Sequence, residues 1–407
     1  MDESPASALT LGSRSTAARA AHIALVSVYL GAAALLLIGS GRVRLGFRKA
    51  PRVLWRALRA RLTGQPPARP DQAPSADALP IAATGDAPVE PASAPHVGPV
   101  PALPPFACPR CHVTLTREPQ RLVCPHGHEF PIVRGIPRFV PSDGYVRSFS
   151  REWNTHRTTQ LDSAGAGGVS ERTLREKTGL APADVAGRVV LDAGVGTGRF
   201  AEILRRWGAC VVGVDLSLAV EAAATNLAGT EGVQLAQADI FELPFAPGTF
   251  DLIVSIGVLH HTPDTRRAFE ALVPLLKPGG TIAIWVYPNE ASYATRVAWI
   301  PFTRRIPADA FYDWCRWLIE VTHRHADTLI AKILWDCFPY SRQGLGAEWD
   351  TLDTFDGFSP RYHGVHHPHE VIEWFRAAGL SEVRESGPHH TSVRGRKPLG
   401  DSSPAVR

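Results

Sequence analysis

The sequence predicts an α/β fold built around a doubly wound parallel sheet. Three observations support this prediction. Short apolar segments typical of buried strands alternate with helical segments between residues 189 and 287. A glycine-rich turn follows the first of these strands, and an acidic residue ends each of the next two. The chain has 407 residues, which exceeds one average domain, so we expect further units around this core.

The first strand and its turn read VVLDAGVGTGRF over residues 189–200. Gly194, Gly196 and Gly198 allow the backbone to approach a ligand closely. Asp192, at the end of the strand, is an acceptor suited to a cationic group of that ligand. The same run also fits the dinucleotide-binding fingerprint, so this motif alone leaves two classes of nucleoside ligand open.

The next two strands each end in an acid. A strand at residues 211–214 ends in Asp215, whose carboxylate can accept hydrogen bonds from both ribose hydroxyls of a nucleoside. A strand at residues 233–238 ends in Asp239 and Ile240, which are positioned to contact an adenine amino group and ring. Parallel strands bind ligands at their carboxyl ends, so we expect these residues to share one site.

We expect a fourth strand at residues 250–255, followed by His260 and His261 in the segment IGVLHH. Imidazole titrates near neutrality, so one of these histidines is a candidate general base at the ligand-binding edge. The alternative role, which we favour, is to shape the pocket wall or to cap the helix that begins near Pro263. A KPGG turn then leads into a strand at residues 281–287.

Taken in order, the motifs DAGVGTG, Asp215, ADI, FDLIVSIGVLHH and LLKPGG resemble those of the class I S-adenosylmethionine-dependent methyltransferase family. The resemblance covers residues 185–290. It implies a seven-stranded Rossmann-like sheet whose last strand is antiparallel, with S-adenosyl-L-methionine as the methyl donor. The donor contacts that it implies are Asp192, Gly194, Gly196, Gly198, Asp215, Asp239 and Ile240. The wider sequence resembles a bacterial subgroup of these enzymes with an N-terminal zinc ribbon.

Residues 104–140 predict that zinc ribbon. A CPRC motif and a CPHGH motif are separated by twelve residues, which is the form of two metal knuckles. Thiolates and imidazole suit tetrahedral Zn²⁺ in a closed, structural site, and the metal would supply much of the folding free energy of so small a segment. The expected ligands are Cys108, Cys111, Cys124 and His128. His126 is an alternative to His128.

The first 103 residues predict a membrane tether. A tail at residues 1–19 precedes an uncharged stretch at residues 20–41, which is long enough for one transmembrane helix. A cleaved signal peptide and an over-long gene start are the alternatives. Residues 42–62 hold eight Arg or Lys and no acid, which by the positive-inside rule places the following chain in the cytoplasm. Residues 63–103, rich in Pro and Ala, predict a disordered linker.

The remaining segments flank the predicted sheet. The expected divisions are a helical extension at 141–184, the core at 185–290, a helical lid at 291–350, a C-terminal part at 351–396 and a tail at 397–407. The many aromatic residues of the lid predict helices over the carboxyl edge of the sheet, where they would select the acceptor. Within the C-terminal part we expect a loop at 353–363 that borders the site, an amphipathic helix at 368–380, and short edge strands near Val383 and Val393.

The function expected from these features is methyl transfer at the cytoplasmic face of the membrane, to a small-molecule, lipid-linked or saccharide acceptor. The alternatives are an RNA (guanine) methyltransferase guided by the ribbon, an NAD-dependent oxidoreductase, and a non-catalytic nucleoside-binding module. The net charge is +4, and removing the eight charges of residues 42–62 leaves −4 for the rest. This mildly acidic remainder argues against a large nucleic-acid footprint.

Overall fold

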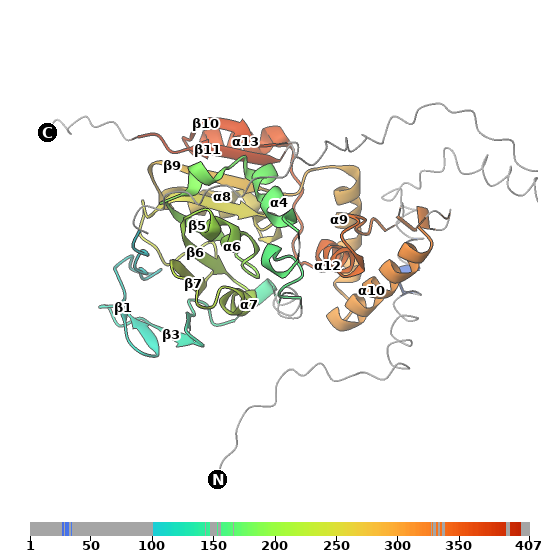
Figure 1. The fold of residues 1–407 in the computed structure, drawn as a ribbon, viewed down its shortest axis with the longest axis horizontal. Helices are drawn as coiled ribbons and strands as arrows, with labels where there is room; N and C mark the ends of the chain where they lie inside the picture. Colours follow the sequence, from blue (N-terminus) through green and yellow to red (C-terminus); the bar gives the residue numbers. More distant parts are fainter. Residues whose placement is uncertain are drawn as a thin grey trace, which may run out of the picture.

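Figure 1 shows the computed structural model of the chain. The described residues are 101–142, 144–146, 153, 156–165, 167–326, 328, 331–332, 334–335, 338–387 and 391–399, together with 27, 29–31 and 34 near the N-terminus. The predicted tail at 1–19, basic segment at 42–62 and nearly all of the linker at 63–103 lie outside these residues. Most of the predicted transmembrane helix also lies outside them. No helix in the described part of the chain is long and apolar enough to cross a bilayer.

The core is a seven-stranded sheet with the order β10-β11-β9-β8-β5-β6-β7. Its strands are β5 (Val189–Ala193), β6 (Cys210–Asp215), β7 (Val233–Gln237), β8 (Phe250–Ile256), β9 (Leu276–Trp285), β10 (Ser381–Glu385) and β11 (Ser392–Arg396). Strands β7, β6, β5, β8 and β9 pair in parallel, whereas β11 runs antiparallel to both of its neighbours. The predicted seven-stranded sheet with an antiparallel last strand is therefore confirmed.

Helices cover both faces of this sheet because alternate residues of its buried strands point to opposite sides. Val190 and Val211 pack in one apolar cluster with α4 (Val169–Thr178), α6 (Arg199–Arg206) and α7 (Ala219–Asn226). Leu191 and Val212 pack in a second cluster with α8 (Thr265–Leu272) and α13 (Pro368–Ala377). The shorter helices are α5 (Pro182–Val185) and the 3₁₀ turns Gly144–Val146, Asp162–Ala164, Leu259–His261 and Val273–Leu275.

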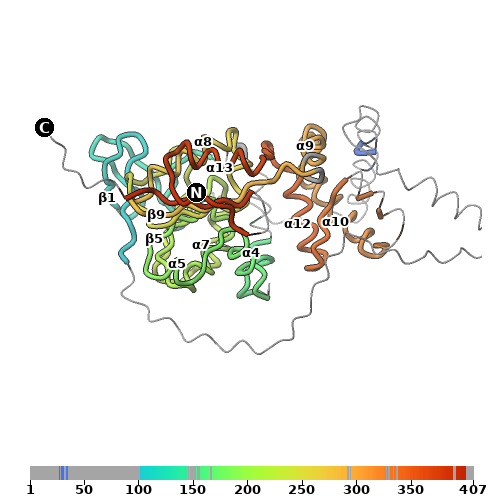
Figure 2. Tube along the Cα trace, turned by 90° about the horizontal axis from the view of Figure 1, so that it is seen from above, coloured from blue at the N-terminus to red at the C-terminus, as the bar shows by residue number. Residues whose placement is uncertain are grey.

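The N-terminal ribbon is a small antiparallel sheet of β1 (Thr116–Arg117), β2 (Arg121–Val123), β3 (Glu129–Val133) and β4 (Ile136–Pro137). Its aromatic residues join the apolar core of the large sheet, and the rings of Phe106 and Phe245 lie 5.5 Å apart. Arg138, just after β4, donates a hydrogen bond of 2.6 Å to Glu221 on α7. The ribbon is therefore docked against the β7 edge, and Figures 1 and 2 place it on the opposite side of the sheet from the orange helices.

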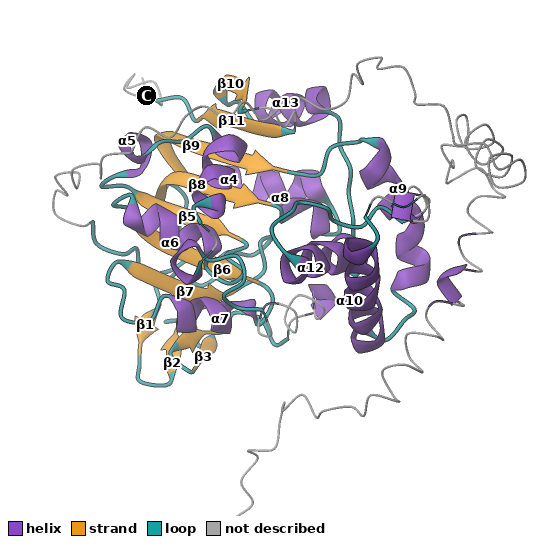
Figure 3. Cartoon of the chain, turned by 45° about the vertical axis from the view of Figure 1, so that its right-hand side comes forward, coloured by secondary structure: helices purple, strands orange, loops and turns teal. Residues whose placement is uncertain are grey.

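The lid consists of the helices α9 (Ala291–Thr303), α10 (Ala308–Arg324) and α12 (Ala347–Phe358). Their shared apolar core includes Trp299, Phe311 and Phe358, and Figure 3 shows the three helices gathered at one side of the sheet. The predicted loop at 353–363 is wrong for residues 353–358, which complete α12. The predicted helix at 368–380 and the two edge strands are confirmed as α13, β10 and β11.

One described fragment of the predicted transmembrane helix contacts the lid. Residues 27, 29–31 and 34 are helical, and Leu30 is buried in the apolar core that α9, α10 and α12 share. Trp314 on α10 donates a hydrogen bond of 3.0 Å from its indole Nε1 to Ser27 Oγ.

Candidate functional site

A cavity of about 530 Å³ lies at the carboxyl ends of the parallel strands. The sheet contributes Gly194 after β5, Asp215 at the end of β6 and Trp285 at the end of β9. The lid closes the other side with side chains that include Arg296 and Asp353. A doubly wound sheet leaves such a crevice where its strand order reverses, which here is the boundary between β5 and β8.

The glycine turn after β5 forms one wall of this cavity. Gly194 has a φ of +92°, and a Cβ there would lie 2.3 Å from the side chain of Val258, so only glycine fits. Gly196 has a φ of +51°, and a Cβ there would meet nothing within 4 Å. Its backbone N–H donates a hydrogen bond of 2.9 Å to Asp215 Oδ2. Gly198 begins α6 as its N-cap.

Asp192 is an acid buried beneath this turn with an incomplete set of partners. It is 2% exposed, and its Oδ2 atom has no hydrogen-bond partner among the described residues. Burial, with a further contribution from the charge of Asp215, raises the pKa of Asp192 to about 7. A buried carboxylate oxygen without a partner is costly unless a cation or donor arrives to satisfy it. This arrangement fits the cationic amino group of a bound amino-acid moiety.

Asp215 is held more tightly than Asp192. Its Oδ1 atom accepts hydrogen bonds from the backbone N–H and the hydroxyl of Ser217, at 2.8 and 2.6 Å. Burial raises the pKa of Asp215, and these hydrogen bonds oppose the rise. The side chain lines the cavity between the glycine turn and β6. These fixed bonds aim its carboxylate before any ligand binds.

Asp239, the third predicted acid, bonds to its own turn. Asp239 accepts a hydrogen bond of 3.0 Å from the backbone N–H of Phe241, so it caps its own turn. Its neighbours Ala238 and Ile240 line the cavity, and Ile240 is buried at 8% exposure. Ile240 therefore offers an apolar surface to the cavity, whereas Asp239 is not among the residues that line it.

The two predicted histidines are separated by the cavity wall. His261 lines the cavity, and its Nδ1 atom lies 3.0 Å from the carbonyl oxygen of Tyr362. His260 is fully buried, stacks on Tyr287 with ring centroids 3.7 Å apart, and accepts a hydrogen bond from the Tyr287 backbone N–H at Nδ1. Burial lowers the pKa of His261 to about 4 and holds the pKa of His260 well below its ordinary value. Both rings are neutral at pH 7, which makes them weak bases and favours the structural role for His260.

The structure adds charged residues that sequence reasoning missed. Arg199 donates a hydrogen bond of 3.0 Å to Gln160 Oε1, and the Gln160 amide lies 3.4 Å from Asp353 Oδ1 on the lid. Burial raises the pKa of Asp353 to about 6 and that of Asp356 to about 7. Lys177, on α4, also lines the cavity. The only sequence signal for Lys177 was its place on the same helical face as Leu174.

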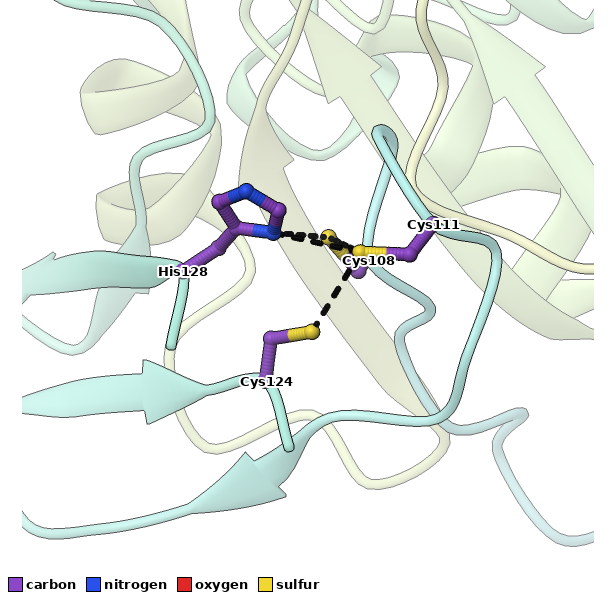
Figure 4. Close-up of side chains that lie close together, drawn as sticks. All are labelled: Cys108, Cys111, Cys124 and His128. Carbon is purple, nitrogen blue, oxygen red and sulfur yellow. Dashed lines mark hydrogen bonds between the residues drawn. The ribbon is translucent and has the colours of Figure 1, made fainter. Parts of the chain in front are cut away.

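The predicted metal ligands converge in the ribbon (Figure 4). The ligand atoms of Cys108, Cys111, Cys124 and His128 all lie within 4.8 Å of one another. The Sγ atoms of Cys108 and Cys111 are 3.5 Å apart, near the ~3.8 Å edge of a tetrahedron with Zn–S bonds of ~2.3 Å. His126 instead uses its backbone N–H, 3.4 Å from Cys124 Sγ. These four residues therefore form a group that can hold a metal ion, with His128 as the imidazole ligand.

Comparison with known proteins locates a methyltransferase domain in this chain. Residues 191–284 match the family described as "Methyltransferase domain". The chain is 36% identical over 129 residues to a demethylmenaquinone methyltransferase of Clavibacter sepedonicus, covering 31% of this chain and 51% of that protein. It is 38% identical over 113 residues to a ubiquinone biosynthesis O-methyltransferase of Paracidovorax citrulli, covering 27% of this chain and 45% of that protein. The chain thus spans about half the length of these relatives.

Solved structures of similar proteins include an S-adenosylmethionine-dependent methyltransferase from Mesorhizobium loti. It is 31% identical, and the match covers 30% of this chain and 56% of that chain with a TM-score of 0.27. A putative methyltransferase in complex with the Trm112 activator of Haloferax volcanii is another match, at 17% identity and a TM-score of 0.37, covering 62% of this chain and 97% of that chain.

Proposed function

Because residues 191–284 form a methyltransferase domain, we propose that the chain transfers the methyl group of S-adenosylmethionine to a small-molecule acceptor. The observation that carries this proposal is the unpartnered Oδ2 atom of buried Asp192, beneath a glycine turn whose Gly196 faces open space. A dinucleotide would bring a pyrophosphate to this turn, and an acid under it would repel that group. A sulfonium donor brings a cationic amino group instead.

The residues that line the cavity, and Asp192 beneath its glycine turn, suit each part of the donor. Asp192 would hold the amino group, Asp215 the ribose hydroxyls, and Ile240 one face of the adenine ring. S-adenosylmethionine supplies the methyl group on a sulfonium, whose positive charge is lost in the reaction. An in-line displacement of this kind needs alignment and a dry pocket more than it needs acid or base groups. The lid, whose Arg296 and Asp353 line the cavity, would limit the access of water to it.

The acceptor that we propose is lipid-linked and aromatic. Two of the matched relatives are named for quinone pathways, and the cavity presents the aromatic side chains of Trp285, Tyr287 and Tyr293 to the acceptor. Tyr287 and Tyr293 lie with ring centroids 4.7 Å apart, which forms a wall suited to stacking. A saccharide acceptor would favour the polar groups of the lid instead.

A membrane anchor at residues 20–41 would deliver such an acceptor, with the catalytic domain on the cytoplasmic side. The support for this anchor is the uncharged stretch of residues 20–41 together with the basic segment that follows it. The contacts of Leu30 and Ser27 show instead that the middle of this stretch packs against the lid. We expect the full chain to remain with membranes after carbonate washing and a chain that starts at residue 63 to be released. A full chain found in the supernatant would contradict the anchor.

We also propose that the ribbon binds one structural Zn²⁺ through Cys108, Cys111, Cys124 and His128. The ribbon does not favour the RNA alternative, because several of its arginines are already neutralised. Arg121 pairs with Glu118 and Glu129, and Arg134 and Arg138 pair with Glu221.

The test of the proposed activity is transfer of labelled methyl to fractions of the host. The purified full chain would be incubated with labelled S-adenosylmethionine and separate lipid, saccharide, protein and RNA fractions. We expect label in the lipid fraction and none with Asp215→Ala as the matched control. Label in RNA alone would support the guanine methyltransferase, and label in no fraction would favour the non-catalytic binding module.

A further inference from the structure

A lysine at the cavity forms no ion pair with the part of the chain that the structure describes. Lys177 lies on the buried face of α4 and is 8% exposed, and none of the ion pairs found between described residues includes it. Its ammonium contacts an aromatic face instead, with Nζ 3.6 Å from the ring centroid of Trp285. Buried lysines are rare unless they are paired, so this one is available to a group that enters the cavity.

The position of Lys177 assigns it to the acceptor rather than to the donor. Trp285 ends β9, and β8 separates β9 from β5. Neighbouring strands lie about 4.8 Å apart, so Trp285 is about 10 Å from the end of β5, where Asp192 lies. The donor contacts belong to β5, β6 and β7. Lys177 therefore faces the other half of the cavity, which Tyr293 and Asp356 close from the lid.

Burial and the neighbouring charges act on the pKa of Lys177 in opposite directions. Burial is the largest influence and lowers the pKa of Lys177 to about 7, whereas Glu176 on the same helix and Glu290 before α9 raise it. On β11, Arg394 donates a hydrogen bond of 2.8 Å to the carbonyl oxygen of Gly179, at the end of α4. A sulfonium in the neighbouring half of the cavity would disfavour the ammonium further. A large share of the amine is therefore neutral near pH 7 and can take up a proton.

We propose that Lys177 is the catalytic base that removes the proton from a phenolic or enolic hydroxyl of the acceptor, an inference that rests on the proposed function. The O–H bond breaks and the proton moves to Nζ, which becomes an ammonium beside the resulting oxyanion. The oxygen lone pair then forms a bond to the methyl carbon while the carbon–sulfur bond breaks. The bonding pair stays on sulfur as S-adenosylhomocysteine leaves, and the ammonium later returns its proton to water.

The same geometry favours an acidic hydroxyl over an aliphatic alcohol. The pKa of an aliphatic alcohol lies far above that of this amine, so the amine cannot remove the alcohol's proton. The pKa values of phenols and enols lie much closer to that of the amine. The ring of Trp285 beside Nζ and the wall of Tyr287 and Tyr293 also suit a flat acceptor. Lys177 therefore selects the acceptor as well as activating it.

The test uses para-nitrophenol, whose phenolate has its own absorption band, added to the full chain saturated with S-adenosylhomocysteine. Below the pH at which free para-nitrophenol ionises, we expect the bound probe to appear as phenolate, with an ionisation constant at least about tenfold larger than in solution. Lys177→Met and Lys177→Gln should abolish this shift. Lys332→Met, which removes an exposed lysine of the lid, should leave it unchanged.

Calorimetry with S-adenosylhomocysteine separates this inference from the proposed function. Wild type and Lys177→Met should bind it within about twofold of each other, which also shows that the variant is folded. A loss of more than tenfold in Lys177→Met would make Lys177 a donor ligand and overturn the inference. A wild type that leaves the probe spectrum unshifted, or a Lys177→Met that keeps the shift, would overturn it too. A wild type that binds no S-adenosylhomocysteine would instead defeat the proposed function.

Discussion

Replacing Asp192 by Asn should stabilise the free protein while weakening donor binding. The pKa of this carboxyl rises from 3.8 to about 7 on folding, so its ionised form costs the unliganded fold up to about 4 kcal/mol. Asn has nearly the same shape and cannot ionise. The stabilisation should therefore be absent below about pH 4, grow between pH 4 and 7 as the unfolded carboxyl ionises, and be complete above pH 7.

The effect on binding has the opposite sign. A hydrogen bond to a charged group contributes about 1.5–3 kcal/mol, so Asp192→Asn should weaken S-adenosylhomocysteine binding about 10- to 100-fold at pH 8. Thermal melting at pH 4 and pH 8 measures the first effect, and calorimetry measures the second. A variant that melts at a lower temperature at pH 8 and binds the ligand as tightly as wild type would refute the reasoning.

Three further predictions concern the turn, the histidines and the ribbon. Gly194→Ala should abolish S-adenosylhomocysteine binding in calorimetry, because its Cβ would lie 2.3 Å from Val258. Gly196→Ala has room for its Cβ but a φ of +51°, so in melting curves it should destabilise the fold by only about 1–2 kcal/mol. Burial lowers the pKa of His261 from 6.5 to about 4, so protonation of this ring favours unfolding as the pH falls from 6.5 to 4. His261→Gln should therefore raise the free energy of unfolding by up to about 3 kcal/mol at pH 4 and leave it unchanged at pH 8, as measured in melting curves. Chelation or Cys124→Ser should remove one zinc per chain by elemental analysis and open the ribbon to proteolysis, while Cys210→Ser should keep the metal.

The sequence predicted the parts of the site that local patterns determine. Asp192, Gly194 and Asp215 follow strands with continuous apolar runs, so their place at the carboxyl edge of the sheet could be inferred from those runs alone. The four metal ligands could also be predicted from local patterns, because each of two tight turns brings a pair of them together. The choice of His128 over His126 depends on the conformation of one turn, which spacing does not determine.

The rest depends on contacts between distant segments. Residues 353–358 lack a helical pattern because α12 is buried on two sides: Phe355 and Phe358 enter the lid core, while Asp353 and Asp356 line the cavity. The docking of the ribbon on the sheet through Phe106 likewise left no local signal. Such placements come from tertiary packing, which a single sequence does not reveal.

The central claim is that the turn after β5 and the acids Asp192 and Asp215 form a socket for a sulfonium nucleoside. The most direct measurement is calorimetric titration of the full chain with S-adenosylhomocysteine and, separately, with NAD⁺. The account predicts one S-adenosylhomocysteine bound per chain and no heat of binding from NAD⁺. Binding of NAD⁺ without binding of S-adenosylhomocysteine would contradict it.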